Sequence, residues 1–328
     1  MSLVRRLIPW FVFGAAAAAS ALFLVWLILA QQTEARILEW VEARRAEGYV
    51  IAWSRFDIGG FPLRILVEFA DAKIAKDATG AEAPLVTADL APWRPDRIDL
   101  AAPRLDLAGP EGRLVLESVT AALHLDGGRA ARLLIDSARG SAQADGDGLG
   151  QAESVRLAVT RFAPEITSWR EESLAGQVSL RRVRPAARFA AQMLFEDPFD
   201  IDLTGAIKGD LHDVVKWRDG GGTIELERLL LAWGPLRVDG NATIALDGEM
   251  RPLGAGTAKL RGLMPTVDRL VAKGQMKPQD AATAKIVLGL LSQPTADGGS
   301  EVAAPVTAQN GQLFLGPVPV ARLLPWKR

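Results

Sequence analysis

Apolar and polar residues alternate along much of the chain beyond residue 49. The clearest example is "LRVDGNATIALD", residues 236–247, in which mostly polar residues stand opposite an apolar or small set: Leu236, Val238, Gly240, Ala242, Ile244 and Leu246. A period of two residues is typical of a β-strand with one covered face. The segment therefore predicts a strand with an apolar side and a polar side.

A second alternating stretch, "DIGGFPLRILVEFADAKIA", spans residues 57–75. On a period of two, one face would carry Leu63, Ile65, Val67 and Phe69. The preceding "YVIAWSRFDI" is also strand-like, so Gly59 and Gly60 predict a hairpin connection. Pro62 belongs at the start of a strand or on an edge.

Further alternating segments include "RIDLAAPRLDLAG", "GRLVLESVTAALHLDGG" and "SVRLAVTRF", which short glycine-rich turns separate. Such turns join neighbouring strands, so we expect an antiparallel meander with one apolar face to cover. Helical patterns at 186–196, 265–273 and 278–292 are candidate covers, and 293–305 is predicted as a loop before a last strand pair. The fold class is mainly β with a few helices (α+β), a long antiparallel sheet covered in part by helices.

The N-terminal region lacks this alternation. Residues 7–30 form a run of 24 residues without charge, preceded by Arg5 and Arg6. As a helix this run is about 36 Å long, against a hydrocarbon core of about 30 Å. Trp10 and Trp26 stand near its ends, as interfacial anchors do. We predict a transmembrane anchor; the alternatives are a cleaved signal peptide and a buried helix of a soluble protein.

A second helix is predicted directly after the apolar run. In residues 31–48, Ala35, Leu38 and Val41 form a stripe with Ile37 beside it, and Gly48 is a plausible stop. By the positive-inside rule, Arg5 and Arg6 stay in the cytoplasm and the rest is exported. The expected organisation is a cytoplasmic N-terminus (1–6), a transmembrane anchor (7–30), a juxtamembrane helix (31–48) and a periplasmic β-rich domain (49–328).

Composition narrows the chemistry. The net charge of −1 and an aromatic content of 6% give no sign of nucleic acid as a partner. The absence of cysteine excludes disulfides and thiolate metal sites. His124 is expected on the solvated face of a strand, and His212 at the start of a short helix. We expect no cofactor, no metal and no catalytic residue, so the protein is predicted not to be an enzyme.

Two charged motifs have alternative interpretations. The run "DGDGLG", residues 145–150, fails as an EF-hand loop because its twelfth position is Arg156, and we interpret it as a hairpin turn. The cluster "RRVRP", residues 181–185, is either a solvated loop or a contact for anionic head groups.

Gly-Pro and aromatic-Pro motifs punctuate the strands. Their expected role is structural, because Gly supplies unusual backbone angles and Pro fixes φ. A ligand or membrane contact is the alternative. The motif residues are Gly60, Phe61, Pro62, Trp233, Gly234, Pro235, Gly316 and Pro317.

These motifs carry a resemblance. The anchor together with "GGFPLRI", "APWRPDRI", "LAWGPLRVDGNATIALDGEMRP" and "NGQLFLGPVPV" is similar to a family of uncharacterised bacterial envelope proteins, a domain of unknown function, in the AsmA-like group. The resemblance implies an inner-membrane protein with a periplasmic, long, curved antiparallel sheet and an apolar groove. Larger members are linked to phospholipid movement and outer-membrane homeostasis, but this chain is too short to bridge a periplasm alone.

The expected function is therefore an inner-membrane-anchored periplasmic protein that binds lipid or another apolar ligand in envelope lipid homeostasis. Its groove would be lined by Leu63, Ile65, Val67, Phe69, Leu236, Val238, Ile244 and Leu246. The same residues equally suit a dry core under the helices. The alternative functions are an envelope scaffold or assembly factor with a protein partner and, less well supported, an envelope hydrolase.

Overall fold

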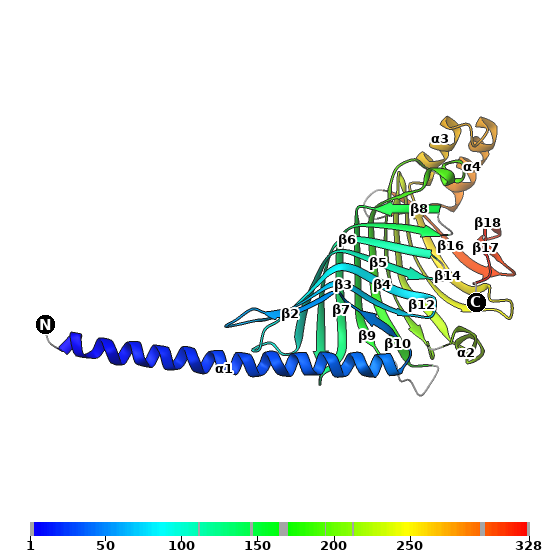
Figure 1. Ribbon diagram of the computed structural model, residues 1–328. Coiled ribbons are helices and arrows are strands. Elements are labelled where there is room, and N and C mark those ends of the chain that lie inside the picture. The colour runs from blue at the N-terminus through cyan, green and yellow to red at the C-terminus, as the bar shows by residue number, and fades with distance from the viewer. Residues whose placement is uncertain are drawn as a thin grey trace. The chain divides into compact units, whose positions relative to one another are not determined.

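The chain is mainly β, with an N-terminal helix and a few short helices (Figure 1). The computed structural model describes residues 3–110, 112–144, 147–163, 170–193, 195–211, 213–295 and 299–326. The chain divides into two compact units, Met1–Arg129 (unit 1) and Ala130–Arg328 (unit 2). All strand pairs described below are antiparallel, as the short glycine-rich turns predict.

A single helix, α1 (Leu3–Ala46), opens unit 1. It joins the apolar run and the predicted juxtamembrane helix without a break. The part of α1 from Ala19 onward is long and apolar enough to cross a membrane or to serve as a signal sequence. Gly48, with a φ of +92°, follows the end of the helix, so the predicted stop is confirmed.

The rest of unit 1 is a sheet around strand β3 (Ile65–Lys76). Its other strands are β1 (Val50–Ala52), β2 (Arg55–Gly59), β4 (Thr79–Leu90), β5 (Arg97–Gly109) and β6 (Gly112–Asp126). Strands β1 and β2 share one edge of β3, while β4, β5 and β6 follow in order on its other side. The predicted hairpin between β2 and β3 is confirmed.

Irregular residues on neighbouring strands form a line across this sheet. Beyond this line, the other set of alternating positions points to the apolar face. Asp71 in β3 and Ser118 in β6 have left-handed backbone conformations, with φ of 51° and 52°. Before the line, Leu114 and Leu116 of β6 fall on even positions, and after it Val119, Ala121 and Leu123 fall on odd positions. Ladders on both sides, such as Ile74–Ala81–Leu107–Leu114 and Ile65–Leu90–Ile98–Leu123, therefore carry apolar side chains.

Unit 2 is a second antiparallel array. Its strands are β7 (Arg129–Ala144), β8 (Asp147–Ala152), β9 (Ser154–Phe162), β10 (Glu172–Pro185), β11 (Phe199–Lys208), β12 (Thr223–Trp233), β13 (Leu236–Leu246), β14 (Pro252–Arg261), β15 (Gln293–Pro294), β16 (Ser300–Gln309), β17 (Gln312–Leu315) and β18 (Val318–Arg322). Strands β8 and β9 lie between β7 and β10, and β11 to β14, β16, β17 and β18 follow in order. Strand β15 pairs with the start of β16.

Helices join strand ends in unit 2. They are the 3₁₀-helix η1 (Ala187–Gln192), α2 (Val214–Asp219), α3 (Leu263–Ala272) and α4 (Pro278–Leu291). Figure 1 shows α3 and α4 beyond the ends of the strands, not over a face of the sheet. The expectation that these two helices cover the apolar face is therefore wrong.

Three local predictions need correction. The helix expected over 186–196 is only the short η1, and the described residues that follow it, Met193 and Phe195, are already outside a helix. The loop expected over 293–305 contains β15 and much of β16; alanine and proline, which strands disfavour, hid this signal. Residues 181–185 belong to β10 instead of a loop, and their arginines pair with carboxylates of neighbouring chain segments.

Candidate functional site

In unit 1, α1 packs against the apolar face of the sheet along a stripe of its own. The least exposed positions of the described helix include Trp26, Ala30, Ile37, Val41 and Arg44, which are spaced by three, four or seven residues. Val41 is almost fully buried, whereas Leu38 and Ala35 are exposed. Of the predicted stripe, Val41 and the neighbouring Ile37 therefore lie on the side that meets the sheet, whereas Ala35 and Leu38 do not.

An apolar pocket of about 240 Å³ lies beneath this helix. Its lining comes from α1, β1, β3, β4 and β5 and includes Ile37, Trp40, Ile51, Phe69, Ile74 and Leu105. Ligand pockets for whole small molecules are usually about 300–1,000 Å³, so this one has room for only part of an apolar chain.

Three of the four lining residues predicted in unit 1 share a face. Ile65 and Val67 are buried, and Phe69 packs with Phe56 at a ring-centroid distance of 5.0 Å. Leu63 does not join them, because β3 begins at Ile65 and Leu63 lies in the preceding loop with 56% of its surface exposed. The alternation of the sequence extended past the true start of the strand.

In unit 2, apolar side chains form ladders that cross many strands. One ladder runs through Ile135, Leu157, Val178, Leu203 and Leu229. The next runs through Val155, Leu180, Ile201, Leu231, Val238, Leu260 and Val302. Paired residues of an antiparallel sheet project to the same side, so the ladders define one continuous apolar face.

This face is only partly covered. Leu260 and Val302 are buried at the β14–β16 end, whereas Leu157, Leu203 and Leu229 keep part of their surface exposed. The predicted lining residues of β13 are also half-buried, and they are Leu236, Val238, Ile244 and Leu246. Val238 and Ile244 lie on two ladders of this face, opposite Leu231 and Ile224 of β12.

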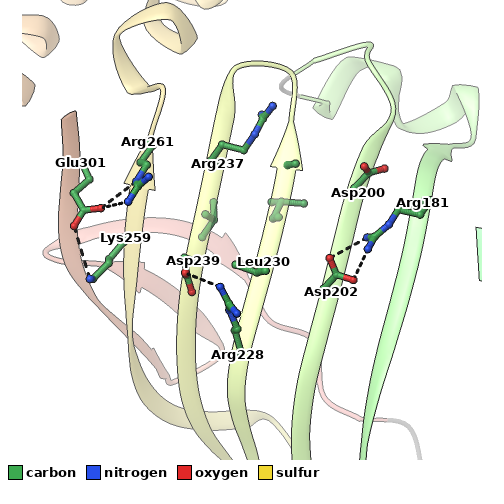
Figure 2. Close-up of a pocket in the computed structure, with 13 residues that line it drawn as sticks. Arg181, Asp200, Asp202, Arg228, Leu230, Arg237, Asp239, Lys259, Arg261 and Glu301 are labelled. Atoms are coloured by element: carbon green, nitrogen blue, oxygen red, sulfur yellow. Dashed lines mark hydrogen bonds and ion pairs between the residues drawn. The ribbon is translucent and has the colours of Figure 1, made fainter. Parts of the chain in front are cut away.

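The opposite face of the same strands is charged. A shallow depression of about 730 Å³ spans β10 to β16 there (Figure 2). Arg181 donates two hydrogen bonds to Asp202, at 3.0 and 2.7 Å, and Arg261 pairs with Glu301 at 3.0 Å. Arg228 lies 3.5 Å from Asp239 on the neighbouring strand.

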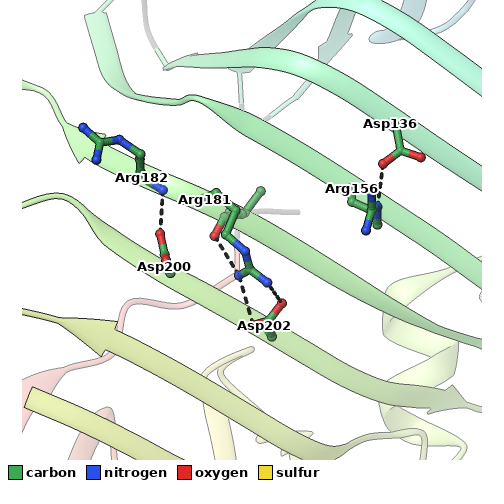
Figure 3. A network of polar contacts seen from close by, with 7 residues as sticks. Asp136, Arg156, Arg181, Arg182, Asp200 and Asp202 are labelled. Atoms are coloured by element: carbon green, nitrogen blue, oxygen red, sulfur yellow. Dashed lines mark hydrogen bonds and ion pairs between the residues drawn. The ribbon is translucent and has the colours of Figure 1, made fainter.

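Charge pairing continues along this face toward β7. Figure 3 shows Arg156 of β9 against Asp136 of β7, at 2.5 Å, as well as the Arg181–Asp202 pair. The hydrogen bond from Arg181 lowers the pKa of Asp202 from its ordinary value, and burial opposes this effect only partly. Exposed cross-strand ion pairs of this kind suit contact with water.

The Gly60-Phe61-Pro62 motif forms the loop between β2 and β3. Gly60 has a φ of +97°, and an added Cβ would lie 2.8 Å from the carbonyl oxygen of Arg64. Phe61 projects from this loop onto α1, where its ring centroid lies 5.4 Å from that of Phe23 and 5.8 Å from that of Trp26. The Phe61–Pro62 peptide bond is cis.

The Trp233-Gly234-Pro235 motif turns the chain from β12 into β13. Trp233 Nε1 donates a hydrogen bond to the Asp197 carbonyl oxygen at 2.9 Å, and its ring meets the fully buried Phe195 edge-on. Gly234 has a φ of +53°, and an added Cβ would lie 3.0 Å from Nη1 of Arg269. The contacts of the motif described here are thus structural.

The Gly316-Pro317 motif is the turn between β17 and β18. Gly316 has a φ of +58°, and its N–H donates to the Pro305 carbonyl oxygen at 2.7 Å. This hydrogen bond holds the β17–β18 turn against Pro305 of β16.

The histidines and the acidic-glycine run offer little chemistry. His124 lies in β6, paired with Arg97 of β5, and is half-buried. A short helix, α2, begins near His212 as expected, capped by Asp213, but His212 itself lies outside the described residues. Of the run 145–150, which was predicted as a hairpin turn, residues 147–150 belong to strand β8 and pair with β7, and residues 145 and 146 lie outside the described residues.

Within the described ranges, no three histidine, aspartate or glutamate side chains gather in a way that could hold a metal ion. The features that sequence reasoning missed are instead packing features. Phe23 and Trp26 contact the loop of Phe61, and Ile37 with Trp40 lines the apolar pocket. The aromatic residues Phe23, Trp26 and Phe61 are visible in the sequence, but no sequence pattern indicates that they contact one another.

The class defined by these observations is a β-sheet protein with an N-terminal apolar helix and two-faced strands, apolar on one side and charged on the other. The chain belongs to the family described as an uncharacterized protein conserved in bacteria (DUF2125), whose model matches residues 26–323. No curated protein and no solved structure matches the chain.

Proposed function

We propose that this protein is a non-enzymatic, inner-membrane-anchored periplasmic protein of the AsmA-like type that binds phospholipid acyl chains. The observation that carries the proposal is the half-buried apolar face of unit 2, backed by a charged face on the same strands. A two-faced sheet of this kind can shield hydrocarbon on one side while its other side stays in water. The proposed role is in envelope lipid homeostasis.

The N-terminal helix supports the membrane placement. From Ala19 onward it is long and apolar enough to span a bilayer, and few of its described apolar side chains are buried. Arg5 and Arg6 precede the apolar run, which favours a cytoplasmic N-terminus and a periplasmic sheet. The family is bacterial, which is consistent with an inner-membrane location.

The energetics favour an acyl chain as the ligand. Removing a methylene from water contributes about 0.8 kcal/mol, so eight methylenes along the apolar ladders would contribute about 6 kcal/mol before ordering costs. The apolar pocket beneath α1, about 240 Å³, offers a second place for part of such a chain.

Lipid mass spectrometry of the full-length protein, purified in gentle detergent, tests the proposal. The test variant replaces Leu203 and Leu229, which face each other on β11 and β12, by glutamine. Each substitution removes one apolar contact, and burying a leucine contributes about 1.5–3 kcal/mol. The L203Q/L229Q protein should therefore retain at least tenfold less lipid than the wild type.

A matched control lies one position further along the same strand pair. Thr204 and Arg228 face each other directly beside Leu203 and Leu229, on the charged side. The T204Q/R228Q protein should carry as much lipid as the wild type, with both variants showing the wild-type circular dichroism spectrum. Equal lipid in both variants, or none in the wild type, would refute the proposed function.

A specific surface favours a second candidate function, an envelope scaffold. Helix α4 exposes Ile286, Leu290 and Leu291, and Leu290 is 82% exposed. Exposed apolar side chains in a row often mark a protein contact. A photo-crosslinking residue in place of Leu290 should capture one stable protein neighbour in intact cells if the scaffold function holds, and none if it does not.

A further inference from the structure

The end of the unit 1 sheet that carries Phe61 lies against the apolar part of α1. Trp26 Nε1 donates a hydrogen bond to the Arg64 carbonyl oxygen at 2.7 Å, and Phe61 sits edge-on to the rings of Phe23 and Trp26. The Arg64 N–H closes the turn by donating to the Gly60 carbonyl oxygen at 3.0 Å. The loop of residues 60–64 is therefore held at one height along the helix.

That height falls inside the apolar run. Phe23 stands seven residues, and Trp26 four residues, before Ala30, the last residue ahead of the polar Gln31. At a rise of 1.5 Å per residue, these positions lie about 10 Å and 6 Å from the end of the run. Interfacial segments that lie in a bilayer are buried to about 5–10 Å, which is the same depth.

The side chains at this end of the sheet suit such a depth. Phe61 is 47% exposed and Leu63 is 56% exposed. The neighbouring loop between β4 and β5, at the same end of the strands, exposes 58% of Trp93. The nearby Arg64 guanidinium is paired with Asp89 at 2.8 Å, so its charge is compensated.

We propose that this end of the sheet, the 60–64 loop with Trp93, is immersed in the outer interface of the bilayer that α1 spans. The occupant of the exposed apolar surface is the acyl-chain region of the lipid, continuous with the lipid around Leu24, Val25 and Ile28 of the helix. This inference rests on the membrane anchor and the acyl-chain binding proposed above, and it adds the place where the unit 1 sheet meets the bilayer.

The consequence is a path from bilayer to sheet. The first apolar ladder beyond the loop, Ile65–Leu90–Ile98–Leu123, begins at the height of the loop. An acyl chain in the outer leaflet would meet this face without crossing water. Trp93 and Arg94 in the adjoining loop are residue types that favour the head-group region.

Single cysteines measure the depth directly, because the natural chain contains no cysteine. The full-length variants L63C and W93C are spin-labelled in vesicles of phosphatidylcholine and phosphatidylglycerol. Collision of the label with oxygen, which concentrates in lipid, is compared with its collision with a water-soluble nickel chelate. Both side chains are exposed, so labelling displaces no packed group.

Two reference positions calibrate the result. V25C lies on the exposed apolar surface of α1, and A78C lies in the exposed turn between β3 and β4, at the other end of the strands. The oxygen-to-nickel ratio at positions 63 and 93 should exceed that at position 78 severalfold, with position 63 near the value at position 25. A ratio at position 63 equal to that at position 78 would overturn the inference.

The outcomes separate this inference from the proposed function. Lipid-exposed labels at positions 25 and 63, with no lipid in the purified protein, would leave the immersed end standing and refute acyl-chain binding. A lipid-exposed label at 25 with water-exposed labels at 63 and 93 would refute the immersed end alone. A water-exposed label at 25 would overturn the membrane anchor and the inference with it.

Discussion

The contacts around Phe195 give the most quantitative prediction for unit 2. This side chain is fully buried, meets Trp233 at a ring-centroid distance of 5.5 Å, and has the Arg269 guanidinium 5.5 Å from its centroid. Arg269 also pairs with Asp197. One buried ring thus connects the β12–β13 turn to helix α3.

Replacing Phe195 by alanine removes this packing. Truncation of a buried phenylalanine costs about 3–5 kcal/mol, which includes the loss of an aromatic pair contributing about 0.5–1.5 kcal/mol. The Arg269–Asp197 ion pair should compensate for little of this loss of stability, because both side chains are about half exposed. The expected loss of local stability is therefore about 3 kcal/mol or more.

Hydrogen exchange detected by mass spectrometry measures this loss on the full chain in detergent. When amide exchange proceeds through local opening at equilibrium, a loss of 3 kcal/mol corresponds to more than about a hundredfold faster exchange in peptides that cover residues 229–238. Phe162, 52% exposed in β9, supplies the matched control F162A, which should exchange within about threefold of the wild type. Exchange in F195A within tenfold of the wild type would refute this account of the motif.

Two further predictions concern charge and backbone space. The pKa of Asp202 is lowered in the folded state by its hydrogen bonds from Arg181, so its stabilising contribution is present above the unfolded pKa of about 3.9 and is lost as pH falls through the folded value. D202N should therefore lower the thermal midpoint at pH 6 more than at pH 2.5, and an equal loss at both values would contradict this. G256A should disrupt the β13–β14 pairing and lower the thermal midpoint, because an added Cβ would lie 2.0 Å from the Asn241 carbonyl oxygen. The control G248A should leave the thermal midpoint unchanged, because an added Cβ there meets open space. Equal thermal midpoints for the two variants would contradict the predicted clash.

Much of the strand pattern could be predicted from the sequence because alternation reflects which side of a strand is covered. Strand β13 matches its predicted segment, and Val238 and Ile244 both lie on the apolar side. The shift from Leu114 and Leu116 to Leu123 in β6 also appears in the sequence. The cause of this shift is the left-handed backbone conformation of Ser118, after which the odd positions point to the face that Leu114 and Leu116 occupy. Only the register of the sheet reveals it.

Other features depend on partners that are remote in the chain. The side of α1 that meets the sheet includes Ile37 and Val41, whereas local periodicity also assigned Ala35 and Leu38 to that side, and both are exposed. The hydrogen bond from Trp26 to Arg64 joins residues that are 38 positions apart. The first half of β16, residues 300–305, escaped prediction because its pairing with β14 outweighs the weak strand preference of its alanines and Pro305.

Photo-crosslinking with a phospholipid that carries a diazirine in its acyl chain tests whether acyl chains bind the apolar ladders of unit 2. Adducts should form in intact membranes on these ladders, at residues such as Leu157, Leu203 and Leu229. Adducts confined to the charged face around Arg156 and Asp239, or to α1 alone, would contradict it.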